Sequence, residues 1–207
     1  MNKKYLLPLI LILLLSFILT GFATYTSQYP TAQSDTYVKA TTKAGTGFWA
    51  YYATDPTKSL TGEHTDKSWL SANGTITNQR FHTDLGSVKI IKRIYYENYH
   101  SSGANTDRGV ENFTFWGSNT AASFAELTYA TDTNWTQITT SQSTFDEHSE
   151  TDVADPKYIT CTNSVAYRYY AFKFADNQTD DAYMGVRRIE LQIEEDADNA
   201  IMLGMNF

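Results

Sequence analysis

The sequence predicts an all-β protein, and three observations support this fold class. Residues that favour strands are abundant, with 15 Tyr and 11 Phe among 207 residues in addition to many Thr. Short segments alternate between apolar and polar residues, and turn-forming residues separate them. No long amphipathic helical pattern and no internal repeat is present. We therefore expect a sandwich or barrel of antiparallel strands.

The expected strands follow one another from the middle of the chain to its end. The clearest alternation places Val88, Ile90, Ile94 and Tyr96 on one face of a strand. Gly117 follows another expected strand and is predicted to adopt a backbone conformation that other residues resist. The expected strands span residues 80–84, which end at the turn Leu85-Gly86, and then 88–96, 112–116, 135–138, 158–162, 167–174 and 184–193.

The N-terminal 23 residues have the layout of a secretory signal peptide. A basic start at Lys3 and Lys4 precedes an apolar run over residues 5–19, and the small residues Gly21 and Ala23 occupy the positions that signal peptidase requires. Cleavage after Ala23 would give a secreted or cell-surface protein. The alternative is an uncleaved membrane anchor, but the run is shorter than the ~20 apolar residues of a spanning helix and contains Pro8.

Charge and cysteine content exclude several classes of partner and cross-link. The formal net charge is −7, and loss of Lys3 and Lys4 with the signal peptide would make it more negative. Such a chain repels phosphate backbones, which argues against nucleic acid, and it repels anionic membrane lipid for the same reason. A single cysteine, Cys161, excludes an intrachain disulfide.

Three landmarks occur in a characteristic order. A strand ends in Asp84-Leu85-Gly86 and an isoleucine-rich strand follows; the strand 112–116 ends in Gly-Ser-Asn; and two closing strands span 167–172 and 185–191. Together they resemble the galactose-binding-like (discoidin, or coagulation factor 5/8 C-terminal) family, and in particular bacterial family 32 carbohydrate-binding modules. The resemblance covers residues 41–194 and implies an eight-stranded antiparallel jelly-roll β-sandwich. A lead-in segment at 24–40 and a C-terminal tail at 195–207 would flank it.

The resemblance implies that loops at one end of the sandwich bind a glycan. A sugar site needs a flat aromatic face and convergent polar side chains. Arg108 lies only four positions before Asn112, closer than relatives place that pair, so Asn105 is the alternative amide and the preferred sugar stays open. The candidate ligand-binding residues are His64 and Trp69 in the first long loop, Tyr99, His100, Asn105 and Arg108 in the middle loop, and Tyr183 in the late loop.

A structural Ca²⁺ is a further expectation from the resemblance, between the first long loop and the last strand. Its candidate ligands are the side-chain oxygens of Asp55, Thr61, Asp66 and Glu190, because hard cations bind several oxygen ligands. In the alternative interpretation, Asp55-Pro56 is a simple turn and Glu190 pairs with an arginine. Arg187 and Arg188 point to opposite faces of their strand, so at least one is expected to pair with an acid.

The leading functional prediction is an exported, non-catalytic, lectin-like module. An enzyme is not expected, because the sequence contains no recognisable catalytic motif. The alternative is a structural or adhesive surface or virion protein that self-associates through its apolar tail at residues 201–207. Binding to membrane lipid is the weakest alternative, because the chain is acidic.

Overall fold

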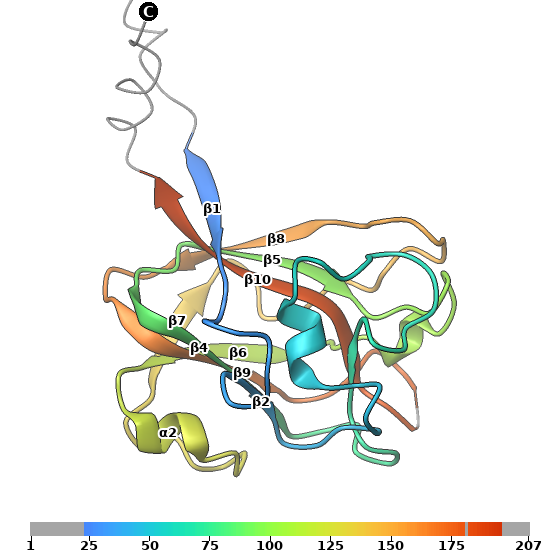
Figure 1. Cartoon of the computed structure of the whole chain (residues 1–207), viewed down its shortest axis with the longest axis horizontal. Helices are drawn as coiled ribbons and strands as arrows, with labels where there is room; N and C mark the ends of the chain where they lie inside the picture. Colours follow the sequence, from blue (N-terminus) through green and yellow to red (C-terminus); the bar gives the residue numbers. More distant parts are fainter. Residues whose placement is uncertain (1–22, 181, 196–207) are drawn as a thin grey trace, which may run out of the picture. The chain divides into compact units, whose positions relative to one another are not determined.

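The computed structural model describes residues 23–180 and 182–195. The predicted signal peptide, apart from Ala23, and the tail beyond residue 195 lie outside the described residues. Residues 27–193 form one compact unit that contains the whole hydrophobic core. The fold class is confirmed: antiparallel strands curl into two facing layers (Figure 1). Ten strands are present in the described part of the chain, two of them only two or three residues long.

The two layers are joined at one seam and contain different strands. The first layer has the order β10 (Gly185–Glu195), β5 (Arg93–Asn98) and β8 (Lys157–Thr162), with the short β3 (Trp69–Leu70) paired to β10. The second has the order β7 (Thr136–Thr140), β6 (Phe113–Ser118), β9 (Tyr167–Phe174), β4 (Gln79–Lys89) and β2 (Val38–Ala40). Pairing of β7 with β8 closes the seam.

The remaining elements are short. They are β1 (Thr24–Gln28), the 3-10 helices η1 (Ala50–Thr54) and η2 (Thr106–Arg108), and the helix α2 (Ala121–Ala125). The stretch expected as a lead-in therefore contains β1 and β2, and Ser27 at the end of β1 donates a hydrogen bond to Glu190. No helix in the described ranges is long and apolar enough to cross a membrane.

Aromatic residues on β4, β6 and β9 fill the space between the layers. Strand alternation places Phe81 of β4 and Phe115 of β6 opposite Phe172 of β9, and all three are buried. Phe115 also stacks on Tyr170, with ring centroids 5.4 Å apart. This packing fixes the sandwich from which the loops project.

The strand expected at residues 88–96 is interrupted in the structure. Strand β4 ends at Lys89 and β5 begins at Arg93, and Val88 and Ile90 are exposed whereas Ile94 and Tyr96 are buried.

Two further sequence-based details differ from the structure. Strand β4 does not end at Leu85-Gly86: a left-handed Gly86, whose N–H donates to the Asp84 carboxylate at 2.7 Å, forms an irregularity inside it. Gly117 does not have a left-handed φ. It is a glycine because the Tyr167 ring lies against it, so a Cβ there would be only 2.2 Å from Tyr167 Cδ2.

Candidate functional site

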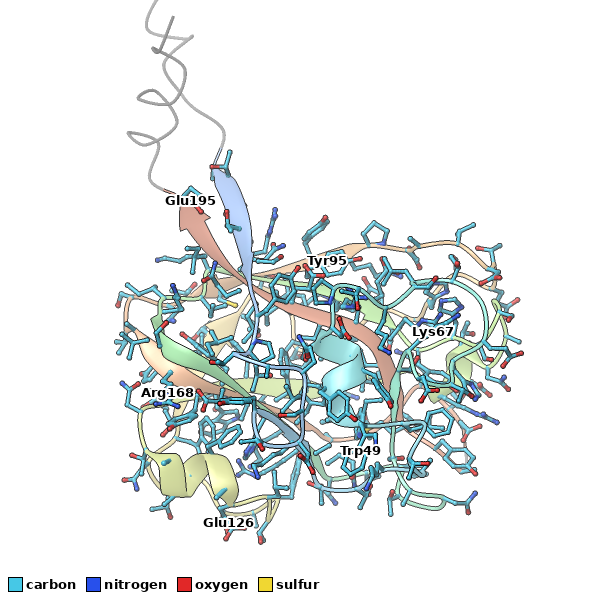
Figure 2. All side chains as sticks on the ribbon, in the orientation of Figure 1. Trp49, Lys67, Tyr95, Glu126, Arg168 and Glu195 are labelled. Carbon is cyan, nitrogen blue, oxygen red and sulfur yellow. The ribbon has the colours of Figure 1, made fainter. Side chains whose placement is uncertain are left out.

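The loops that carry the predicted binding residues gather at one end of the sandwich. In Figure 2, Lys67 of the first long loop lies at that end, whereas Arg168 and Glu126 lie at the opposite side of the view. Backbone hydrogen bonds hold the middle and late loops together, from Gln178 N–H to the Gly109 carbonyl (2.8 Å) and from Thr179 N–H to the Asp107 carbonyl (3.0 Å). Segments about 70 residues apart are thereby held side by side.

Arg108 connects the middle loop to the late loop. Its Nε donates to the Asp180 carboxylate at 3.2 Å, and its guanidinium carbon lies 5.0 Å from the centre of the Tyr183 ring. The Arg108 side chain is 23 % exposed, so donors remain accessible to a ligand. A cation held over an aromatic face and beside a carboxylate is oriented before any ligand arrives.

Asp180 is held in its ionised form. Partial burial raises the pKa of the Asp180 carboxyl, but hydrogen bonds from the Tyr183 and Ala182 N–H groups and from Arg108 together lower it below its usual range. The two backbone bonds are short, at 2.6 and 2.7 Å. Asp180 therefore offers a fixed acceptor beside the donors of Arg108.

Tyr99 and His64 form the inner part of the cluster. The Tyr99 hydroxyl lies 2.5 Å from His64 Nδ1, and the Phe48 ring packs edge-on against His64. Burial raises the pKa of Tyr99 to about 12 despite the nearby Arg108, so the hydroxyl stays protonated. Burial also lowers the pKa of His64, which is neutral at physiological pH and can accept the Tyr99 proton in this hydrogen bond.

These six residues define the loop-end cluster, and four of them were predicted from the sequence. The predicted members are His64, Tyr99, Arg108 and Tyr183. Phe48 and Asp180 were missed as site residues, although an arginine in a loop site requires an acidic partner and Asp180 precedes Tyr183 by three positions. Asn105 is exposed at the start of η2, three residues before Arg108, with a left-handed φ of 57°.

Trp69 and His100 do not belong to the candidate site, contrary to the sequence-based prediction. Trp69 has no exposed surface, and its indole N–H donates to the Thr42 carbonyl at 2.9 Å. His100 is equally buried, with Nε2 2.8 Å from the Leu60 carbonyl and Nδ1 accepting the Gly103 N–H at 3.1 Å. Their polar atoms are satisfied internally, so neither side chain is available to a ligand.

The predicted Ca²⁺ ligands do not converge. The Asp55 carboxylate accepts hydrogen bonds from the Thr57 N–H and hydroxyl, and Glu190 pairs with Arg188 at 3.1 Å, as the alternative interpretation expected. Asp66 interacts instead with the Tyr52 hydroxyl. Within residues 23–180 and 182–195, no three His, Cys, Asp or Glu side chains come together in a way that would hold a metal ion.

Backbone carbonyl groups of the first long loop face an arginine. Arg187 is fully buried and donates to the carbonyls of Ser59 (3.3 Å), Thr61 (2.6 Å) and His100 (3.2 Å). Burial lowers the pKa of Arg187 to about 10, so it stays charged at neutral pH. Thr61 was expected to offer its side-chain oxygen to Ca²⁺, but its hydroxyl lies 3.2 Å from that of Ser59. The Arg187 guanidinium bound to the Thr61 carbonyl also repels a second cation. The residues present therefore do not fit Ca²⁺.

The comparisons with known proteins agree with the β-sandwich fold. No family model matches the sequence, and no characterised protein matches it by sequence. Among solved structures, the family 32 module of NanJ from C. perfringens, in complex with galactose, aligns with a TM-score of 0.53 at 10% identity, over 82% of this chain and 100% of that one. The chain has the fold of a family 32 carbohydrate-binding module.

A second protein with this galactose-binding-like fold gives the same result. The family 32 module of AlyQ in complex with 4,5-unsaturated mannuronic acid aligns with a TM-score of 0.50 at 18% identity, over 80% of this chain and 98% of that one. A truncated AlyQ that contains the family 32 module and the alginate lyase domain aligns with a TM-score of 0.55 at 16% identity, over 84% of this chain and 35% of that one.

Proposed function

We propose that this chain is an exported, non-catalytic carbohydrate-binding module that binds glycans at the loop-end cluster. The observation that carries the proposal is the juxtaposition of Arg108, Asp180 and Tyr183, which come from two loops distant in sequence. The family 32 fold, found in modules solved with bound sugars, adds support. Export rests on the signal-peptide layout of residues 1–23.

The cluster supplies the two kinds of contact that a pyranose ring needs. Arg108 offers guanidinium donors and Asp180 an ionised acceptor, a combination that can bind neighbouring hydroxyl groups. Tyr183 and Phe48 offer aromatic surface for the apolar side of the ring. Their mutual contacts hold the polar groups in place before binding, which lowers the entropic cost of association.

The same chemistry favours binding over hydrolysis. A glycosidase needs two carboxyl groups, one of them with a raised pKa so that it can donate a proton. The loop-end cluster contains one carboxylate, Asp180, and its pKa is lowered. A paired, ionised Asp180 is suited to holding a hydroxyl group rather than protonating a leaving group.

The test is a glycan-array screen of the protein, with and without Ca²⁺, using Arg108→Ala as the site variant. We expect binding to a defined set of glycans and about a ten-fold or greater loss for Arg108→Ala, because charged hydrogen bonds are removed. Arg168→Ala is a matched control, since Arg168 also pairs with an acid (Asp84) and lies over a ring (Tyr169), but at the other end.

Two outcomes would contradict the proposal. One is a blank array on multivalent display, which would favour the structural or adhesive surface-protein alternative. The other is an equal loss of binding for Arg108→Ala and Arg168→Ala, which would show that the ligand does not bind at the loop-end cluster.

A further inference from the structure

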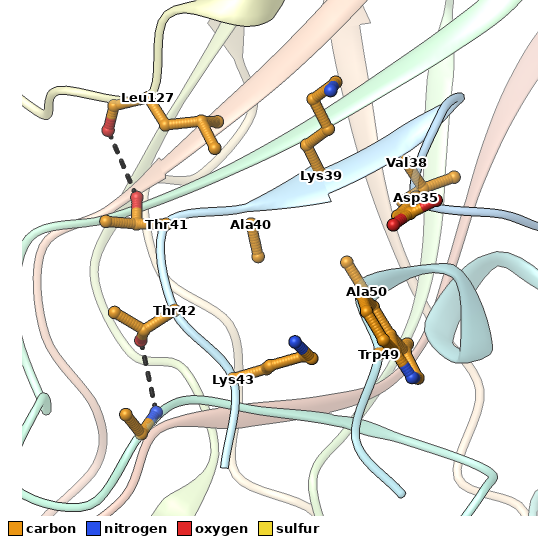
Figure 3. A pocket seen from close by; sticks show the side chains of 11 residues that line it. Asp35, Val38, Lys39, Ala40, Thr41, Thr42, Lys43, Trp49, Ala50 and Leu127 are labelled. Atoms are coloured by element: carbon orange, nitrogen blue, oxygen red, sulfur yellow. Dashed lines mark hydrogen bonds between the residues drawn. The ribbon is translucent and has the colours of Figure 1, made fainter. Parts of the chain in front are cut away.

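A second concave site lies at the edge strand β2 (Figure 3). It is a pocket of about 480 Å³ between β2, the segment that follows it and the start of η1. None of the loop-end cluster residues lines it. The residues that do are Asp35, Val38, Lys39, Ala40, Thr41, Thr42, Lys43, Trp49, Ala50, Ala72 and Leu127.

One wall of this β2 pocket is aromatic. The Trp49 ring is supported by Tyr51, which stacks on it with a centroid distance of 5.8 Å and an interplanar angle of 19°. Lys43 extends toward Trp49, and its Nζ lies 3.7 Å from the ring centre (Figure 3). Ala40 and Ala50 add small apolar surface, so the pocket has an apolar wall whose Trp49 ring is covered by the Lys43 ammonium group.

Two lysines in the pocket have no acidic partner. In the described part of the chain, neither Lys39 nor Lys43 forms an ion pair, and each ammonium group lies over an aromatic ring instead, Lys39 at 5.5 Å from Phe124. Asp35, which is exposed, is the only carboxylate in the lining. The pocket lining, with two lysines and one aspartate, is therefore positively charged, whereas the whole chain has a net charge of −7.

The hydroxyl groups of the lining are already engaged. Thr41 donates to the Leu127 carbonyl and Thr42 to Gln79. The Lys39 ammonium group lies over Phe124, which does not line the pocket. The groups left for a ligand are therefore the Lys43 ammonium group, the Asp35 carboxylate and the aromatic wall. This set matches a ring that carries a negative charge and hydroxyl groups.

We propose that the β2 pocket binds a uronic acid unit of an acidic oligosaccharide. Its carboxylate pairs with Lys43 and draws that ammonium group off the Trp49 ring, its apolar ring face then lies against Trp49, and Asp35 accepts a hydroxyl proton. The proposal rests on the proposed function in that both sites take carbohydrate. The two sites differ in position, because Arg108 belongs to the loop-end cluster and Lys43 to the β2 pocket. They also differ in the charge of the sugar that each is proposed to prefer.

The test compares a galacturonic acid trimer with its methyl ester, which has nearly the same shape but no charge, on the full chain. We expect the acid to bind more tightly at low salt, by about five-fold, because Lys43 binds its carboxylate, and we expect the difference to shrink as salt rises. The Trp49 indole N–H resonance, assigned with Trp49→Phe, should shift with the acid. Lys43→Gln should abolish the preference for the acid and leave binding of neutral glycans unchanged.

Lys58→Gln is the matched control. Lys58 also lies over an aromatic ring, 4.8 Å from the Tyr52 centre, but it is not part of the pocket. Loss of the charge preference in Lys43→Gln alone supports the β2 pocket. Equal losses in both variants, equal affinity for acid and ester, an unmoved Trp49 resonance, or equal binding of a poly-glutamate peptide would each overturn the proposal. A charge preference that survives Arg108→Ala, with no binding of neutral glycans, would overturn the proposed function alone.

Discussion

Gly185, at the start of β10, determines how closely Tyr99 of the loop-end cluster packs against the sheet. A Cβ at this position would lie 2.7 Å from Tyr99 Cδ2 and 2.8 Å from the Trp69 carbonyl oxygen. Real Cβ atoms do not approach so closely, so any side chain here displaces the Tyr99 ring. His64 and Arg108 depend on that ring for their positions.

We therefore expect Gly185→Ala to lower the free energy of unfolding by about 1–3 kcal/mol through overpacking, and to weaken glycan binding as well. Urea denaturation and binding assays would measure the two effects. Gly45→Ala is the control, since nothing lies within 4 Å of a Cβ at Gly45 and its φ is not left-handed. A Gly185→Ala protein as stable as the control would show that Tyr99 moves without cost.

At the scale of an element, the first long loop is attached to β10 by guanidinium groups. Arg187 binds the carbonyls of Ser59 and Thr61, and Arg188 binds that of Lys58 at 2.6 Å. Without these donors, several carbonyl groups would be left without a partner in a largely buried setting, which is costly. Two neighbouring arginines on one strand thus order a loop that has little regular structure of its own.

The prediction at this scale concerns metal dependence. Chelation with EDTA, or addition of Ca²⁺, should leave the Tm unchanged, because Arg187 already binds the carbonyl groups. Arg187→Met should lower stability by about 3 kcal/mol or more, as expected when buried partners lose a charged donor, with Arg187→Lys intermediate. Calorimetry with and without EDTA is the measurement, and a fall in the Tm of the unmodified protein on chelation would contradict this account.

At the scale of the whole molecule, the pH dependence of stability involves two buried histidines with lowered pKa values, His82 and His100. Burial lowers the pKa of each to about 4, against about 6.5 in the unfolded chain. His82 Nδ1 lies 3.0 Å from the Phe124 carbonyl, and its Nε2 has no hydrogen-bond partner among the described residues. His100 accepts a backbone N–H at Nδ1, so a proton there would break that bond.

Stability should therefore fall with acidification. The unfolded chain binds more protons than the folded one between pH 6.5 and 4, so the stabilisation is complete above pH 6.5 and is lost progressively down to about pH 4. At pH 5 we expect a loss of about 1–2 kcal/mol for each histidine. Urea midpoints across this range would measure it, and a slope that is no shallower in His100→Asn would contradict the role of His100.

The sequence predicted the sandwich because strand alternation and the order of its landmarks are local patterns that survive in the fold. It also placed Arg108 and Tyr183 in loops at the same end of the sandwich, as the structure has them, because the order of the loops along the chain indicates it. Burial of His100 was not predictable, because it depends on how long loops pack against one another. The expected Ca²⁺ ligands do not converge for a similar reason: loop geometry, and not residue type, decides which groups face one another.

The Arg187 contacts make the order of the first long loop independent of the concentration of any free cation. A loop ordered by a dissociable ion loses that ion on dilution, so its stability varies with the free concentration of the ion. Here the cation is covalently part of the chain, and its effective concentration at the loop carbonyls is set by β10 alone. The loop geometry is therefore acquired in the same step as the fold and does not depend on the ionic composition of the surrounding medium.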